Sequence, residues 1–132
     1  MDGTVVGIDV AKNSLDVCLL GGEKRWHRQF SNAPEGHRAL ERWLKQRSAL
    51  PLGICLEATG QYGEAVAECL HQQGHRVSVV NPARIKAFGQ SQLRRNKTDK
   101  ADAHLIAQFC LSQRPLRWSP PWPLTRAATG FE

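Results

Sequence analysis

Short apolar runs separated by turn-forming residues fill the first quarter of the chain, a pattern typical of β-strands. Residues 5–10 are almost continuously apolar or small, which predicts a strand buried on both faces of a sheet. In residues 14–20, Leu15, Val17 and Leu19 occur at every second position, so they share one face of a predicted strand. Gly21 and Gly22 then begin a turn. Residues 25–30 follow this turn, so the segment predicts a three-stranded meander.

Helical and extended patterns alternate after this meander. Leu40, Trp43 and Leu44 follow Pro34 at the spacing of an amphipathic helix, which we expect to start after capping residues 31–33 and to end before Pro51. Residues 52–57 and 76–80 predict two further strands, and a short helix should run from Asn81-Pro82 to about Phe88. Between these strands a helix closed by Gly74 is expected to bury one stripe: Tyr62, Ala65, Val66, Cys69 and Leu70.

The last third of the chain predicts a loop, one more helix and a tail. Residues 89–97 have no apolar period and are expected to form a loop. Thr98 can cap a helix from 99 to about 111, and four prolines from Pro115 onward oppose regular structure. The buried stripe of this helix should comprise Ala103, Ile106, Ala107 and Cys110. We therefore expect an α/β fold with a mixed five-stranded sheet flanked by helices in residues 1–114, and a Pro-rich tail in residues 115–132.

Composition indicates which partners the protein could bind and in which cellular compartment it is expected. The 132 residues suit one domain, and 18 Lys and Arg against 12 Asp and Glu give a formal charge of +6, which favours a polyanion such as nucleic acid. The four cysteines form no CxxC pair and predict buried, reduced thiols. The sequence contains neither a signal peptide nor an apolar run long enough for a membrane span, so we expect a cytoplasmic protein.

Four acidic residues are placed where a metal site could form. Asp9 and Glu57 each end a predicted buried strand, and Asp99 and Asp102 are three residues apart at the start of the last helix. Each has an ordinary explanation when taken singly. Asp9 could end a strand and form a turn, Asp99 could gain from the helix dipole, Glu57 could cap a helix, and Asp102 could pair with an arginine. Together they favour a divalent cation, because clustered carboxylates repel one another and suit Mg²⁺ or Mn²⁺.

Basic residues gather beside these acids and predict contacts with a nucleic-acid backbone. A charged, solvated loop is the alternative. The histidines show no ligand spacing, and we assign none of them to a metal. The candidate nucleic-acid-binding residues are Lys12, Arg84, Lys86, Arg94, Arg95, Lys97 and Lys100.

Four motifs in order resemble a known family. They are GIDVAKNSLDVCL, CLEATGQYGEAVAECL, VVNPARIKAFGQS and KTDKADAHLIAQF, and the similarity extends from about residue 5 to 122. They resemble the N-terminal domain of the DEDD transposases, the bridge-RNA-guided insertion-sequence recombinases related to the Piv invertases. The resemblance implies an RNase H-like (RuvC-like) fold, with the four acids as catalytic metal ligands. It also implies Mg²⁺ or Mn²⁺ as cofactor, a DNA substrate, a structured guide RNA, and dimers or higher oligomers.

The sequence departs from the family after about residue 123. Family members continue into a helical arm and a second domain that supplies a catalytic serine, and Ser119 lies in the wrong context to replace it. We therefore expect residues 115–132 to be the start of a truncated arm, and the chain alone not to be fully active. The open alternatives are a stand-alone RuvC or RNase H-like nuclease and a non-catalytic nucleic-acid-binding remnant. An actin-like sugar-kinase fold is disfavoured, because Ala11-Lys12-Asn13 replaces the Gly and Thr of its phosphate loop.

Overall fold

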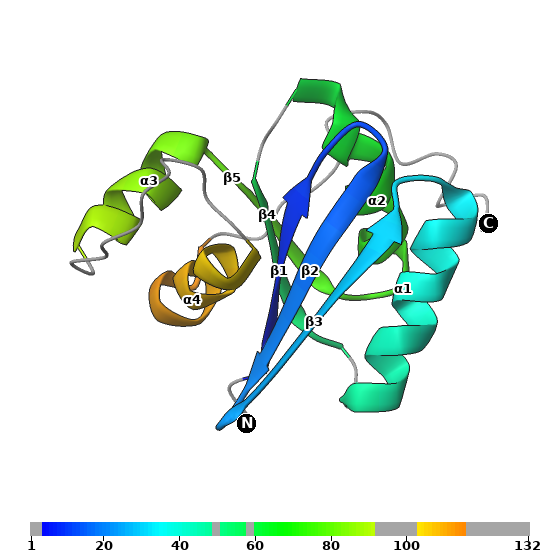
Figure 1. Ribbon diagram of the computed structural model, residues 1–132, viewed down its shortest axis with the longest axis horizontal. Helices are drawn as coiled ribbons and strands as arrows, with labels where there is room; N and C mark the ends of the chain where they lie inside the picture. Colours follow the sequence, from blue (N-terminus) through cyan, green and yellow to red (C-terminus); the bar gives the residue numbers. More distant parts are fainter. Residues whose placement is uncertain (1–3, 49–50, 58–59, 92–102, 116–132) are drawn as a thin grey trace.

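A five-stranded mixed sheet forms the centre of the protein (Figure 1). The computed structural model describes residues 4–48, 51–57, 60–91 and 103–115. The strand order is β3-β2-β1-β4-β5; β2 pairs antiparallel with β1 and β3, and β4 pairs parallel with β1 and β5. This architecture confirms the mixed sheet expected from the sequence. The strands are β1 (Val5–Val10), β2 (Ser14–Gly21), β3 (Lys24–Ser31), β4 (Gly53–Glu57) and β5 (Arg76–Val80).

Helices cover both faces of this sheet (Figure 1). One face packs against α1 (Pro34–Arg47) and α2 (Glu64–Gln72), and a 3₁₀ turn, η1 (Gly60–Gly63), precedes α2. The other face packs against α4 (Ala103–Gln113), with α3 (Pro82–Ser91) beside it. The alternation of side chains along each strand therefore divides the apolar residues into two cores, one on each side of the sheet.

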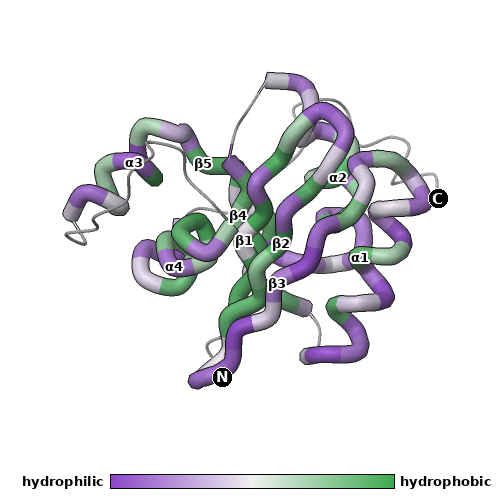
Figure 2. The backbone as a smooth tube through the Cα atoms, in the orientation of Figure 1, coloured by the Kyte–Doolittle hydropathy of each residue, from purple (hydrophilic) through white to green (hydrophobic). Residues whose placement is uncertain are grey.

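The alternation along β1 decides which helices its acid faces. Val6, Ile8 and Val10 belong to the core under α1 and α2, whereas Val5 packs in the core under α4. Asp9 has the same parity as Val5, so it lies on the α4 side of the sheet. The tube in Figure 2 shows the hydrophobic residues concentrated in the central strands, with hydrophilic residues along the outer turns of α1.

Helix α4 packs unusually close to β1 at Gly7. A Cβ atom built on Gly7 would lie 2.5 Å from the carbonyl oxygen of Ala103 and would also clash with the backbone of Ala107. Only a residue without a side chain permits this approach. Gly7 therefore fixes the first turn of α4 directly above β1, two residues before Asp9.

Three local predictions are wrong. Tyr62 lies in η1 and is 42% exposed, and Ala65 is exposed on α2, because the apolar stripe of α2 starts later, with Val66, Ala67 and Leu70 buried. Helix α3 continues through residues 89–91, which we expected to form a loop, since Gly89 is buried and packs near Leu105. Residues 31–33 provide no side-chain cap for α1.

The cysteines are free thiols. Cys18, Cys55 and Cys110 are buried, and Cys69 is half-buried. A hydrogen bond with Cys110, together with burial, raises the pKa of the Cys55 thiol above its ordinary range. This pair joins β4 to α4, on the same side of the sheet as Asp9.

No helix among the described residues is long and apolar enough to span a bilayer.

Candidate metal centre

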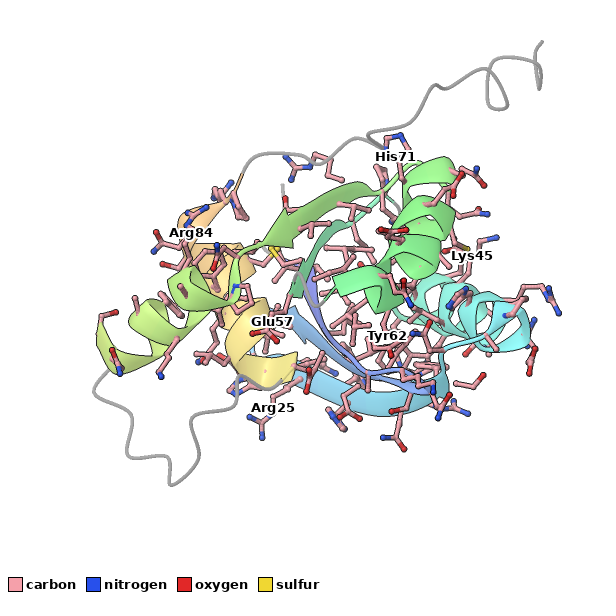
Figure 3. All side chains as sticks on the ribbon, turned by 90° about the horizontal axis from the view of Figure 1, so that it is seen from above. Arg25, Lys45, Glu57, Tyr62, His71 and Arg84 are labelled. Atoms are coloured by element: carbon pink, nitrogen blue, oxygen red, sulfur yellow. The ribbon has the colours of Figure 1, made fainter. Side chains whose placement is uncertain are left out.

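Asp9 and Glu57 lie side by side at the ends of two neighbouring parallel strands. Ile8 of β1 pairs with Leu56 of β4, and the same register carried one residue further places Asp9 opposite Glu57. Neighbouring strands are about 4.8 Å apart, and residues at one level point to the same face. Figure 3 shows Glu57 on the side of the sheet that α4 covers. The structure thus brings together two of the four predicted ligands.

The same row contains a third acid, which the sequence analysis missed. Asp16 of β2 pairs with Asp9, and Gln29 of β3 pairs with Asp16. The Gln29 side-chain amide donates a hydrogen bond of 3.0 Å to the Asp16 carboxylate. The alternation along β2 could have identified this residue. Asp16 lies between Leu15 and Val17 in the chain, so its side chain points to the opposite face of the sheet from theirs. Four polar residues, from Gln29 to Glu57, therefore cross the sheet in one line.

The three acids of this row are all removed from solvent to some degree. Asp9 is only 9% exposed, and Glu57 and Asp16 are half-buried. Like charges directly opposite one another on neighbouring strands repel. The donor set consists of hard carboxylate oxygens, which fit Mg²⁺ or Mn²⁺ and do not suit a metal that prefers sulfur or nitrogen ligands.

The other two predicted ligands, Asp99 and Asp102, lie outside the described residues. Helix α4 begins at Ala103, the residue that follows Asp102 in the chain, and Ala103 contacts β1 at Gly7. In the part of the chain that the structure describes, no three His, Cys, Asp or Glu side chains are grouped closely enough to hold a metal ion. A complete site therefore needs at least one ligand from outside these residues.

One asparagine ties together the segments that follow Asp9 and Glu57. The Asn32 side-chain amide donates to the carbonyl oxygen of Ala11 at 2.8 Å and to that of Tyr62 at 2.9 Å. Its carbonyl oxygen accepts a hydrogen bond of 2.9 Å from Nε2 of His37. The sequence predicted that Asn32 would help to cap α1, but its side chain does not do so. It joins the β1–β2 turn, η1 and α1 at the edge of the sheet where the acids lie.

The described basic candidates are all exposed. Lys12 is exposed in the β1–β2 turn, and Arg84 and Lys86 are exposed on α3. The guanidinium of Arg84 lies over the Phe109 ring of α4 at 5.2 Å, and its charge opposes the rise in the Cys55 pKa. Figure 3 shows Arg84 and Glu57 on the same side of the sheet, the side of α3 and α4. The remaining candidates, Arg94, Arg95, Lys97 and Lys100, fall outside the described residues.

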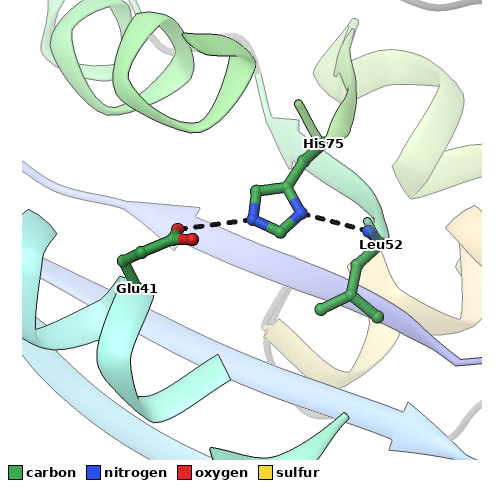
Figure 4. Close-up of polar contacts among 3 residues, drawn as sticks. All are labelled: Glu41, Leu52 and His75. Carbon is green, nitrogen blue, oxygen red and sulfur yellow. Dashed lines mark hydrogen bonds and ion pairs between the residues drawn. The ribbon is translucent and has the colours of Figure 1, made fainter. Parts of the chain in front are cut away.

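A second buried polar group, formed by His75 with Glu41 and Leu52, lies on the opposite face of the sheet. The sequence provided no reason to assign a special role to this histidine. His75 is fully buried; its Nδ1 accepts a hydrogen bond of 3.1 Å from the Leu52 backbone N–H, and its Nε2 lies 3.3 Å from the Glu41 carboxylate (Figure 4). With Nδ1 accepting, the ring proton sits on Nε2 and is donated to Glu41. This group connects α1 to the starts of β4 and β5, so its role is structural.

Comparison with known proteins adds two findings. A model of the IS110-type DEDD family, described as transposase, matches residues 6–125. The pilin gene-inverting proteins of Moraxella bovis and Moraxella lacunata are each 36% identical to the chain over 122 residues, which cover 91% of it. The chain spans 38% of the length of either relative. The matched region includes all four predicted acids and every described strand and helix apart from the first residue of β1.

Proposed function

The chain belongs to the DEDD transposase family, and we propose on this basis that it is the N-terminal, metal-binding catalytic domain of a DNA transposase or site-specific recombinase. The family membership and the mixed sheet together identify the fold as RNase H-like. The proposed substrate is a DNA phosphodiester. The observation that carries the proposal is the placement of Asp9 and Glu57 at one level on neighbouring parallel strands.

Asp9, Glu57, Asp99 and Asp102 are the proposed ligands of Mg²⁺ or Mn²⁺. Asp9 and Glu57 offer carboxylate oxygens from fixed strands, and Asp102 is joined directly to Ala103, whose position over Gly7 is set by close packing. Divalent cations in such sites stabilise the charge that develops on the attacking and leaving oxygens of a phosphodiester. The burial of Asp9 keeps its carboxylate in one orientation.

Positive side chains near the acids are proposed to hold the DNA backbone. Lys12, Arg84 and Lys86 are exposed, and long cationic side chains neutralise phosphates without reading base sequence. The same role is proposed for the four basic residues of positions 94–100. The target sequence must then be selected by another component.

The resemblance to the family suggests what that component and the remaining machinery are. We propose that a structured guide RNA selects the DNA target and that the protein acts as a dimer or higher oligomer. In this scheme the acids contribute metal binding, and a serine-bearing second domain of the family forms the covalent DNA intermediate. Of the four proposed ligands, Asp9 and Glu57 lie among the described residues.

Metal titration tests this proposal. Isothermal titration with Mg²⁺ and Mn²⁺ should give binding that Asp9→Asn and Glu57→Gln each abolish. Glu64→Gln is the matched control, since Glu64 is an exposed acid on α2, across the sheet, and its loss should leave the titration unchanged. Binding that survives both strand substitutions would show that the acids hold no metal and would favour a non-catalytic nucleic-acid-binding module.

A further inference from the structure

Positive charge is concentrated in the unit formed by β3 and α1, and α1 packs on the face of the sheet opposite the candidate metal centre. Residues 24–47, which form β3 and α1, contain seven Lys and Arg and two acids, whereas the rest of the chain contains eleven Lys and Arg and ten acids. Of the two acids, Glu41 is buried against His75, so Glu35 is the only acid that α1 exposes. Most of the net charge of the chain therefore resides in this unit.

Three cations form a stripe along the outer face of α1. Arg38, Arg42 and Lys45 are exposed and occupy positions i, i+4 and i+7, so they follow one line about 10 Å long. Among the described residues, none of the three forms an ion pair with an acid. Three acids lie in this region: Glu35, one turn before Arg38, the buried Glu41, between Arg38 and Lys45, and Glu68 on α2. The stripe is left without neutralising charge along most of its length.

Two further cations lie on β3, on the face of the sheet that α1 covers. Lys24 and Arg28 share the side of the sheet that faces α1, since they have the parity of Trp26 and Phe30. The Lys24 ammonium lies 5.9 Å from the Trp26 ring centre, and the Arg28 guanidinium lies 5.4 Å from that of Phe30. Stacking on aromatic rings restrains these cations but does not neutralise their charge. They remain available to an anion.

We propose that this surface, the stripe of Arg38, Arg42 and Lys45 on α1, binds the phosphate backbone of a second DNA duplex. Like charges one turn apart on a helix repel, and a polyanion removes that repulsion while releasing counterions. The surface lies across the sheet from Asp9, so the duplex it holds is not the one presented to the acids. The choice of DNA rests on the proposed function, because recombination joins two DNA duplexes.

Salt-dependent binding tests the surface. In EDTA, fluorescence anisotropy with a 20-base-pair duplex of arbitrary sequence should show a slope of log K against log salt that Arg38→Ala with Arg42→Ala reduces by about two. Alanine favours helix, and circular dichroism verifies the fold; Arg38→Gln with Arg42→Gln replaces the pair if the first variant unfolds. Arg76→Ala with Arg114→Ala removes the same charge from exposed sites on β5 and after α4, and should change the slope by less than about half a unit.

A bridging assay tests the two-duplex arrangement. Protein bound to an immobilised duplex should capture a second, labelled duplex, and the Arg38 and Arg42 variant should lose this capture while its Mg²⁺ titration is unchanged. Asp9→Asn should show the reverse, losing the metal response and keeping the salt slope, which separates failure of this surface from failure of the proposed function. An unchanged slope, a loss confined to duplex RNA, or a change only in self-association by light scattering would each overturn the proposal.

Discussion

Asp9 and Glu57 occupy the same level of two parallel strands, one residue beyond the paired Ile8 and Leu56. The distance between neighbouring strands, about 4.8 Å, sets how far apart their backbones are, and the pleat directs both side chains toward α4. Two acids that are 48 positions apart in the chain thus become neighbours through strand pairing.

Gly7 should tolerate no side chain. Gly7→Ala would push the new Cβ into the backbone of α4 at Ala103 and Ala107, and overpacking of this kind costs about 1–3 kcal/mol. Guanidinium denaturation measures the loss. Gly53 provides the control, because it pairs with Val5 on the neighbouring strand and a Cβ there would make only ordinary contacts, at 3.7 Å and beyond. Equal destabilisation by Gly53→Ala would refute the role of close packing at Gly7.

Asp16 should tune the site without being essential to it. Asp16→Asn removes one of three carboxylates in a row, so the metal-free protein should gain about 0.2–1 kcal/mol of stability. The lost charge should also weaken Mn²⁺ binding by a few-fold. Thermal denaturation with and without Mn²⁺ measures both effects. Complete loss of Mn²⁺ binding would instead make Asp16 a direct ligand.

Asn32 should hold the edge of the site in place. Asn32→Asp keeps the size of the side chain but replaces the amide that donates to Ala11 and Tyr62 with a carboxylate that repels both carbonyl oxygens. We expect weaker metal binding and faster amide exchange in the β1–β2 turn and η1. Asn13→Asp, an exposed change in the same turn, is the control for the added charge. Identical behaviour of the two variants would remove Asn32 from the account.

His37 should make stability depend on pH. Burial lowers the pKa of His37 below 6.5, although Glu35 acts in the opposite direction. The unfolded chain therefore binds the proton more readily, so this contribution is complete above pH 6.5 and is lost as the pH falls toward the folded pKa. Denaturation from pH 7.5 to 5.0 should show a smaller decline for His37→Gln than for the wild type. Parallel curves would contradict this assignment.

His75 should be needed for folding stability and not for metal binding. His75→Ala leaves the buried Glu41 carboxylate and the Leu52 N–H without their partner, and breaking such a buried pair costs about 3–5 kcal/mol. Adding Glu41→Leu should recover part of this loss, because it removes the isolated charge. Urea denaturation of the single and double variants provides the test. His27→Ala, at an exposed position on β3, should change stability by less than about 0.5 kcal/mol.

Local periodicity predicted most of the elements, because each depends on residues close together in the chain. The meander, the parallel strands and the buried stripe of α4 all follow from spacings of two or of three and four residues. Asp9 and Glu57 were recognisable for the same reason, since each ends an apolar run. The helix end at residues 89–91 was missed because the burial of Gly89 depends on Leu105 of another helix.

Three polar contacts could be identified only from the three-dimensional structure. Asp16 joins the row only through the register between β2 and β1, which no local pattern specifies. Asn32 has the character of a helix cap, yet its amide bonds to Ala11 and Tyr62, from two distant segments. His75 has no distinguishing sequence pattern; the pairing of β4 with β5 places Leu52 beside it, and the packing of α1 on the sheet places Glu41 there. In each case the partner lies at least 7 positions away in sequence, beyond the reach of local patterns.

The location of a bound cation tests the central claim most directly. Crystals soaked in Mn²⁺ should show an anomalous peak within about 2.0–2.5 Å of carboxylate oxygens from both Asp9 and Glu57. The same peak should be missing from crystals of the Asp9→Asn protein. A Mn²⁺ ion bound elsewhere, or one that remains in the Asp9→Asn protein, would contradict the proposal that these two strands carry the metal centre.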